Sequence, residues 1–268
     1  MIGARDGDFA ARVRRRILFD RNPLFITLVD KYAVSAVAAA KGIATSKLLH
    51  ITDSAESLLE LDLPDNCFIK ANHGSGWNIR RSEGRFVLFA DGSRIQHAGT
   101  VVGELTREQT VDCCRAWLGR KWHRREWAYQ QVRPRILVEE TLKPSDDGEL
   151  RDFRFYTFNG SVKAISIGSP TYRSQGLNVF FYPDWHVIPL ESGSITLPDP
   201  LPVRPALLDD MIAAAEALGA GIDFVRVDLY DTDQGIRLGE ITIYPESGYR
   251  DTPTKSRLFN RWLGNQWK

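Results

Sequence analysis

FVRVDLYDTDQGIRLGEITIYP, residues 224–245, consists of two runs in which apolar and polar residues alternate, joined by the connector DTDQG. Alternation over such short runs predicts β-strands, and a connector rich in Asp with a Gly predicts a hairpin. Side chains two positions apart on a strand share a face, so Arg226 pairs with Asp228 and Glu240 with Thr242. Two carboxylates beside an arginine on adjacent strands can hold Mg2+ and the phosphates that it carries. A solvated cross-strand charge cluster is the alternative interpretation.

Composition excludes several classes of protein. The 268 residues include 35 Lys and Arg against 34 Asp and Glu, a net charge of +1, so no overall field favours nucleic acid or a membrane. No apolar run reaches about 18 residues, and the basic N-terminal sequence has no apolar signal core. Cys67, Cys113 and Cys114 lack metal-site spacing, and an adjacent pair forms a poor disulfide. We therefore expect reduced thiols in a cytoplasmic protein without a transmembrane segment.

The remaining patterns predict more strands than helices and more hairpins than crossovers. Hairpins are expected around Ile79 and Phe86 and at Asn159-Gly160 in RDFRFYTFNGSVKAISIG. Helices are expected over residues 9–19, 30–41, 106–118 and 206–218, the second of them with Asp30 as its N-cap. These elements predict an α+β fold of two lobes with largely antiparallel sheets.

The segment FIKANHGSGWNI, residues 68–79, places Lys70 at the end of a predicted strand and glycines at 74 and 76. Phosphates bind such loops because glycine lets the backbone approach closely and turn its amides inward. No Gly-Lys-Ser/Thr opens a helix afterwards, so this is not a Walker loop. An ordinary hairpin turn is the alternative.

Two further segments could contact a nucleotide. Lys31 follows Asp30 in LVDKYAV, where it is either solvated or a second cation for a triphosphate. RILVEETL is an apolar strand whose backbone from Glu139 to Leu142 could hydrogen-bond an adenine edge. Taken alone, it is a buried strand with an acidic end.

In this order, the motifs resemble the ATP-grasp superfamily, and specifically its TupA-like branch, which is named for a teichuronopeptide biosynthesis protein. The resemblance rests on DRNPL, LVDKYAV, NHGSGWNI, PRILVEE, FYTFNG and FVRVDLY, between about Asp20 and Gly248. It implies an α+β ATP-grasp fold whose two lobes, with mainly antiparallel sheets, hold ATP between them. Few residues precede Lys31, so the N-terminal Rossmann-like lobe is expected to be reduced or absent. The expected parts are a helical extension (1–24) and an ATP-grasp domain (25–268), with a small lobe at about 45–138 and a C-terminal catalytic lobe at about 139–268.

The resemblance implies roles for particular residues of this sequence. Two lysines would contact the ATP phosphates, the HGSG loop would close over the γ-phosphate, the VEE strand would line the adenine, and an aspartate would bind the ribose. The residues at these cofactor-binding positions are Lys31, Lys70, His73, Gly74, Ser75, Gly76, Glu139, Glu140, Leu142 and Asp152.

The same resemblance places Mg2+ on Asp228 and Glu240, and assigns catalytic charge neutralisation to Lys70, Arg154 and Arg226. Two positions depart from the superfamily pattern. Thr242 stands where an asparagine usually follows the second metal carboxylate, which puts a full second metal site in doubt. Glu246 stands where a glycine might be expected, and its carboxylate would join the metal shell or contact an amine substrate.

The activity implied is an ATP-dependent carboxylate–amine ligase that forms an amide or peptide bond through an acyl-phosphate. Positioning and charge neutralisation supply most of such catalysis. The branch suggests an amino acid or uronic acid in cell-surface polysaccharide biosynthesis, with Arg173 and Asn178 in YRSQGLNVFF as candidates for gripping an anionic substrate. An ordinary polar hairpin is the other interpretation of that segment.

Two other functions remain open at the level of sequence. An ATP-grasp kinase would keep the nucleotide site and phosphorylate a hydroxyl acceptor. A non-catalytic glycan- or nucleic-acid-binding protein could instead use CCRAWLGRKWHRREWAYQQVRPR, in which basic residues alternate with aromatic ones. A helix with a packed Trp side and a solvated charged side is the simpler interpretation of that segment, and no binding to DNA is expected.

Overall fold

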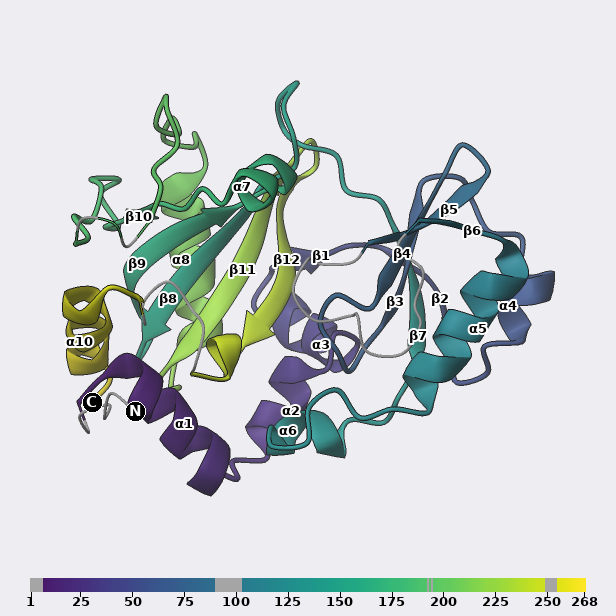
Figure 1. Ribbon diagram of the computed structural model, residues 1–268, viewed down its shortest axis with the longest axis horizontal. Coiled ribbons are helices and arrows are strands. Elements are labelled where there is room, and N and C mark those ends of the chain that lie inside the picture. Colours follow the sequence, from purple (N-terminus) through teal and green to yellow (C-terminus); the bar gives the residue numbers. More distant parts are fainter. Residues whose placement is uncertain (1–6, 90–102, 192, 194, 249–254) are drawn as a thin grey trace. The chain divides into compact units, whose positions relative to one another are not determined.

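The computed structural model describes residues 7–89, 103–191, 193, 195–248 and 255–268. Contacts between residues divide the chain into two units (Figure 1). The first comprises the described residues of Met1–Leu28, Val34–Thr45 and Lys143–Lys268, and the second comprises Val29–Ala33 and those of Ser46–Leu142. Each unit is built on one six-stranded sheet. This arrangement agrees with the predicted α+β class.

The sheet of the first unit has the strand order β1-β12-β11-β8-β9-β10. Its strands are β1 (Ala44–Thr45), β12 (Gly235–Thr242), β11 (Val225–Thr232), β8 (Asp152–Phe158), β9 (Ser161–Gly168) and β10 (Phe180–Phe181). All neighbours are antiparallel except β1 and β12, which are parallel. The expected hairpin at Asn159-Gly160 is confirmed, since both residues adopt positive φ between β8 and β9.

One face of this sheet is apolar and covered. Helix α8 (Leu208–Gly219) packs against β8, β9 and β11, and its Gly219 lies against Thr157 and Val225 (Figure 1). Because side chains alternate along a strand, Arg154 on β8 and Arg226 on β11 point to the opposite face. The face of the sheet that carries these two arginines is therefore not covered by α8.

The N-terminal and C-terminal helices of the first unit share an aromatic core. Helix α1 (Phe9–Phe19) packs against α10 (Arg257–Gln266), and the ring of Phe9 meets those of Phe224 and Trp267. Among the described residues of the unit, four short helical segments remain, of which two, α2 (Leu24–Val29) and α3 (Ala33–Ala39), border the segment 29–33 that belongs to the second unit. The other two are α7 (Pro170–Gln175) and the 3-10 turn η1 (Pro245–Gly248).

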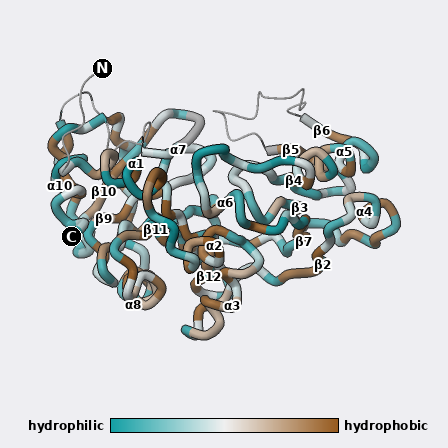
Figure 2. Tube along the Cα trace, turned by 90° about the horizontal axis from the view of Figure 1, so that it is seen from below, coloured by the Kyte–Doolittle hydropathy of each residue, from teal (hydrophilic) through white to brown (hydrophobic). Residues whose placement is uncertain are grey.

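The second unit has an entirely antiparallel sheet, β2-β7-β3-β4-β5-β6. Its strands are β2 (Leu48–Thr52), β7 (Ile136–Glu140), β3 (Cys67–Ala71), β4 (Asn78–Ser82), β5 (Arg85–Phe89) and β6 (Glu104–Leu105). Its helices are α4 (Ser57–Glu60), α5 (Arg107–Leu118) and α6 (Trp127–Gln131). Buried residues of β3 and β7 form one hydrophobic core with α5. Figure 2 shows how hydrophobic and hydrophilic residues alternate along the part of the chain that the structure describes.

The Trp-rich and Arg-rich segment belongs partly to this core. Trp117 is buried in α5 and lies parallel to Trp77, while Trp122 packs edge-on against Trp77. The packed-helix interpretation therefore holds for Trp117, whereas Trp122 packs on the same core from beyond the end of α5. None of the helices that the structure describes has both the length and the apolar character to cross a membrane.

Two predicted details are wrong. Thr232 pairs with Gly235, so only Asp233 and Gln234 form the tip of the carboxylate hairpin, and the strands are longer than expected. The helix expected from Asp30 begins at Ala33. The Asp30 carboxylate accepts a hydrogen bond from the backbone N–H of Tyr32, which makes a turn in place of the first helical residues.

Candidate functional site

A row of charged side chains crosses three strands of the first unit. In the strand register, Asp228 lies opposite Arg154 on one side and opposite Glu240 on the other. Arg226 lies opposite Thr242 in the same way. The alternation in the sequence predicted that these residues share one face, and the register confirms it.

Arg226 is the centre of this row. Its Nε donates to Asp228 Oδ1 at 2.7 Å and its Nη2 to Asp228 Oδ2 at 2.6 Å, a two-point contact. The same Nη2 reaches Glu240 Oε1 at 3.2 Å and Thr242 Oγ1 at 3.0 Å. The Thr242 hydroxyl in turn donates to Glu240 Oε1 at 3.0 Å. One guanidinium therefore holds both candidate metal carboxylates in place.

Burial sets the electrostatics of the row. Desolvation raises the pKa of Asp228 to about 6, although the charge and hydrogen bonds of Arg226 oppose the shift. Burial acts to lower the pKa of Arg226, but attraction and hydrogen bonding to Asp228 outweigh it, and the pKa rises well above its ordinary value. A buried carboxylate that is poorly solvated gains strongly from a cation beside it. The row is therefore suited to bind a cation or to exchange one cation for another.

A second ion pair extends the row on β8. Asp152 Oδ2 accepts a hydrogen bond from Arg154 Nε at 2.6 Å, and both side chains are largely buried. Gly168 on β9 lies opposite Asp152, and a Cβ at this glycine would overlap the Arg154 guanidinium and the Asp152 carboxylate. The ion pair therefore occupies the space that a side chain at residue 168 would need. Gly168 carries no signal in the sequence, because its requirement comes from a neighbouring strand.

The second unit contains the other candidate cation. Lys70 Nζ forms an ion pair with Glu139 Oε2 at 2.6 Å across β3 and β7. Glu140, the last residue of β7, links this strand to the residue before β2, because its Oε1 accepts from the backbone N–H of Lys47 at 3.2 Å. Leu142 lies two residues beyond the end of β7 and is half-buried. The structure therefore brings Lys70 and Glu139 together and places Leu142 beyond the end of β7.

The glycine loop between β3 and β4 is anchored at its base by Asn72, which is fully buried. Its side-chain Oδ1 accepts from the backbone N–H of Arg135 at 2.8 Å, and its Nδ2 donates to Asp30 Oδ1 at 2.9 Å and to the carbonyl of Arg133 at 3.0 Å. Its own carbonyl accepts from the backbone N–H of Lys31 at 3.1 Å. This residue was missed by the sequence reasoning, because its partners lie about forty to sixty positions away in the chain.

His73 anchors the loop on its other side. Its Nδ1 contacts Asn72 Oδ1 at 3.0 Å, and its Nε2 contacts the carbonyls of Trp117 and Arg120 at 3.1 and 3.0 Å. Burial lowers the pKa of His73, with smaller opposing contributions from those carbonyls. Both ring nitrogens are therefore engaged within the unit, and only the backbone of His73 remains to contact a phosphate.

The loop itself is tightly packed up to Gly74. A Cβ at Gly74 would overlap the ring of Trp77, so a glycine is required there for space. Gly76 adopts φ +72°, a conformation that glycine tolerates best. Lys31 Nζ donates to the carbonyl of Gly74. Ser75 and Gly76 are the half-buried residues at the tip.

Comparison with known proteins identifies the family. The family model described as TupA-like ATP-grasp matches residues 114–268, more than half of the chain. The chain belongs to the TupA-like ATP-grasp family. The resemblance seen in the sequence motifs is thereby confirmed, and with it the ATP-grasp fold class. No curated protein gives a significant match.

Solved structures of ATP-grasp ligases are similar to this TupA-like chain at low identity. The ligase PsnB, solved with its precursor peptide PsnA2 and AMPPNP, is 13% identical (TM-score 0.40) over 92% of this chain and 60% of its own. D-alanine–D-alanine ligase from Bacillus anthracis, solved with ATP, is 12% identical (TM-score 0.44) over 90% and 63%. L-amino acid ligase from Bacillus licheniformis is 16% identical (TM-score 0.42) over 81% and 43%. The chain thus spans less than two thirds of the length of each of these three enzymes.

The candidate substrate residues of this family member lie elsewhere in the first unit. Arg173 is in α7, a helix where a polar hairpin was the alternative interpretation, and its side chain lies outside the described part of the structure. Asn178 follows that helix and donates its backbone N–H to the carbonyl of Thr196 at 2.9 Å. Glu246 is exposed in η1 with φ +48°.

Proposed function

We propose that this chain is an ATP-dependent ligase that joins a carboxylate to an amine through an acyl-phosphate intermediate. The observation that carries the proposal is the contact of one buried arginine, Arg226, with Asp228, Glu240 and Thr242 on a single sheet face. Such a concentration of paired charges is costly to bury and is typical of sites that handle phosphates and their cations. Membership of the TupA-like ATP-grasp family supports the same assignment.

Under this proposal, the second unit supplies contacts to the nucleotide. Lys70 and Lys31 neutralise phosphate charge, and the backbone of the loop His73, Gly74, Ser75 and Gly76 donates to phosphate oxygens. The end of β7, from Glu139 and Glu140 to Leu142, lines the adenine, partly through its backbone. Glu139 accepts from Lys70 in the structure, so the lysine is held in place before a phosphate binds.

The first unit supplies the cation site and the remaining charge. Asp228 and Glu240 fit Mg2+, because they are hard oxygen donors in direct register and Mg2+ is commonly held by one or two carboxylates together with substrate phosphates. Bound Mg2+ would neutralise charge on the phosphoryl oxygens. Arg226 and Arg154 would stabilise charge on the transferred group, and Asp152 would bind the ribose.

The chemistry needs positioned charges and no protein nucleophile. A substrate carboxylate oxygen attacks the γ-phosphorus of ATP, which gives an acyl-phosphate and ADP. An amine then attacks the acyl carbon, phosphate leaves, and an amide remains. We propose an amino acid or uronic acid of cell-surface polysaccharide biosynthesis as the acid, with Arg173, Asn178 and Glu246 as candidate substrate contacts.

We place this reaction in the cytoplasm. Cys67, Cys113 and Cys114 are unpaired, and Cys67 and Cys114 are buried. Unpaired thiols are typical of reducing compartments.

A hydroxylamine trap tests the proposal. Purified protein, Mg-ATP and a pool of amino acids and uronic acids are incubated with hydroxylamine, which replaces the unknown amine, and mass spectrometry detects hydroxamate and ADP. We expect hydroxamate from wild type and from Lys41→Ala, an exposed lysine used as a control, and its loss in Lys70→Ala. A stable phosphorylated product without hydroxamate would contradict the ligase and indicate a kinase. Hydroxamate of equal yield from Lys70→Ala would contradict the assignment of the site.

A further inference from the structure

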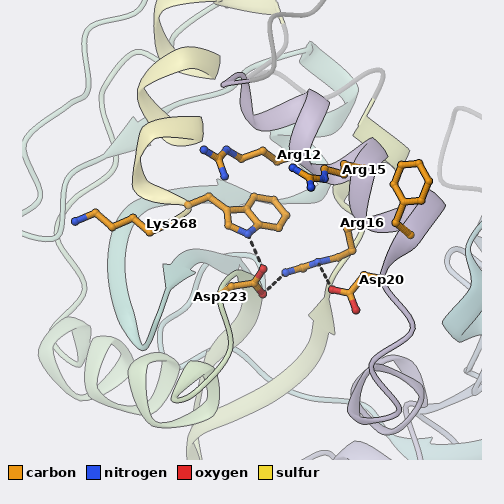
Figure 3. A pocket seen from close by; sticks show the side chains of 8 residues that line it. Arg12, Arg15, Arg16, Asp20, Asp223 and Lys268 are labelled. Carbon is orange, nitrogen blue, oxygen red and sulfur yellow. Dashed lines mark hydrogen bonds and ion pairs between the residues drawn. The ribbon is translucent and has the colours of Figure 1, made fainter.

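A basic pocket lies in the first unit, between α1 and the C-terminal residues of the chain (Figure 3). Its volume is about 500 Å3. The residues that line it are Arg12, Arg15, Arg16, Phe19, Asp20, Asp223, Trp267 and Lys268. None of them belongs to the charged row on β8, β11 and β12.

The positive charge of the pocket exceeds its negative charge. The lining contains four cationic side chains and two carboxylate side chains. Both carboxylates have partners: Asp223 accepts from Arg16 and from Trp267 Nε1, and Asp20 lies 3.9 Å from Arg16 Nε. Among the described residues, no acidic group pairs with Arg12 or Arg15. The excess charge is therefore carried by side chains without an acidic partner.

Two arginines that line the pocket have a buried donor without an acceptor. The Nε atoms of Arg12 and Arg16 are buried and have no hydrogen-bond partner. The 3.9 Å between Arg16 Nε and Asp20 Oδ2 is an ion pair but too long for a hydrogen bond. A buried donor without an acceptor costs free energy, and such groups are rare in folded proteins. Two arginines of the lining therefore have hydrogen-bonding capacity that the described residues do not use.

Arg16 makes the floor of the pocket rigid. Its side chain is 2% exposed, and its Nη1 donates to the carbonyls of Phe224 and Ile243 at 2.8 and 3.2 Å. Its guanidinium lies 4.4 Å from the centre of the Trp267 ring. Arg12 is three positions from Arg15 and four positions from Arg16, so it is a neighbour of both on the surface of α1. The guanidinium groups are thus gathered on a fixed support.

We propose that this pocket binds a phosphate monoester as its dianion. Guanidinium groups match the oxygens of phosphate with paired hydrogen bonds, and several cationic side chains favour a dianion over a single carboxylate. Two apolar side chains at the C-terminal end of α1, Leu18 and Phe19, are 59% and 74% exposed, and Phe19 also lines the pocket. The phosphate is therefore carried either by a small soluble ester or by a lipid headgroup whose chains meet these residues.

The site is separate from the charged row, although it lies in the same unit. Asp223 precedes Arg226 by three residues, which is roughly 10 Å along an extended chain. Arg12 and Arg15 can therefore be changed without altering a residue assigned to ATP or Mg2+. The test of the pocket is accordingly independent of the proposed ligase reaction and uses neither ATP nor metal.

The experiment compares three proteins at constant ionic strength. They are wild type, the double variant Arg12→Gln/Arg15→Gln, and a control, Arg204→Gln/Lys163→Gln, which removes two charges elsewhere in the same unit. Isothermal titration and thermal unfolding measure binding of glucose 1-phosphate, with sodium chloride as the anion control. Sedimentation with phosphatidylcholine vesicles, with and without phosphatidic acid, measures binding of a lipid phosphate.

We expect wild type and control to bind a phosphate monoester, and the double variant to bind at least about tenfold more weakly, as loss of charged hydrogen bonds predicts. Binding should strengthen from pH 5.5 to 7.5 as the ester, with a second pKa near about 6, becomes a dianion. Binding only to phosphatidic acid vesicles, with the same dependence on Arg12 and Arg15, supports the site and assigns a lipid source. Absence of both kinds of binding, or equal binding by all three proteins, would overturn the proposal.

Discussion

The charged row of the first unit and the glycine loop of the second handle polar groups in opposite ways. In the row, Arg226 and Asp228 form a buried ion pair between residues two positions apart on β11. In the loop, Asn72 and His73 are fully buried side chains that contact each other, backbone groups and a single carboxylate. The row depends on paired charges, and the loop depends on hydrogen bonds to the backbone.

The two regions should therefore respond differently to substitution. A buried ion pair tolerates replacement of both members better than loss of one, because a single remaining charge is left uncompensated. A buried network of hydrogen bonds loses several partners at once when its central residue is truncated. Mutations that distinguish these two responses test the comparison directly.

The largest effect is expected from Asp228→Ala. It leaves Arg226 buried without its main partner, so the free energy of unfolding should fall by about 3–5 kcal/mol, as for other broken buried pairs. Urea denaturation followed by circular dichroism measures this change. The double variant Arg226→Met/Asp228→Leu should recover most of the loss. A double variant that is as unstable as the sum of the two single changes would show that the row is not held by charge compensation.

Asn72→Ala should have the next largest effect, in the second unit. It removes the acceptor for Arg135 N–H and the donor to the Arg133 carbonyl and to Asp30. Unsatisfied buried groups cost about 1–3 kcal/mol each, so we expect a loss of about 2–4 kcal/mol in the free energy of unfolding. Hydrogen exchange should increase first in the loop from Asn72 to Trp77. Ser57→Ala, at an exposed hydrogen-bonding hydroxyl of the same unit, is the control. Equal effects of the two substitutions would mean that the network does not anchor the loop.

Gly168→Ala tests the packing of the Asp152–Arg154 ion pair without removing a charge. The added methyl group overlaps the Arg154 and Asp152 side chains, so we expect a loss of about 1–3 kcal/mol, typical of overpacking. Gly119→Ala is the matched control, because its Cβ would meet only ordinary contacts of 3.6 and 3.8 Å at negative φ. Thermal unfolding of both variants gives the comparison. A Gly168→Ala protein as stable as the Gly119→Ala protein would place the ion pair elsewhere.

The pH response of the row should be visible in binding of Mg-ATP. Burial raises the pKa of Asp228 to about 6, so the folded protein holds this proton more tightly than the unfolded chain does. Protonation of Asp228 therefore favours folding, a contribution present below pH 4 and lost as the pH rises through about 6. A cation must displace that proton, so the affinity for Mg-ATP should fall by about tenfold per pH unit below that pKa. Titration calorimetry from pH 5 to 8 measures it, and a flat profile would contradict this assignment.

Local rules explain why the sequence predicted the row and missed the network. Alternation alone placed Arg226 with Asp228 and Glu240 with Thr242, because strand periodicity depends only on neighbouring residues. Asn72 and Gly168 gave no signal, since their requirements come from residues far away in the chain or on another strand. Asp30 was misassigned as a helix cap for the same reason, because its carboxylate also accepts from Asn72. The hairpins and the antiparallel sheets were predictable, and the contacts that fix the loop were not.

The nucleotide site can be tested by titration of Mg-ATP into wild type, Lys70→Ala and Asp228→Asn, with the exposed Lys41→Ala as control. We expect wild type and control to bind with equal affinity. Each of the other two should bind at least about tenfold more weakly, because each loses a charged contact to phosphate or to its cation. Wild-type affinity in both Lys70→Ala and Asp228→Asn would contradict the account.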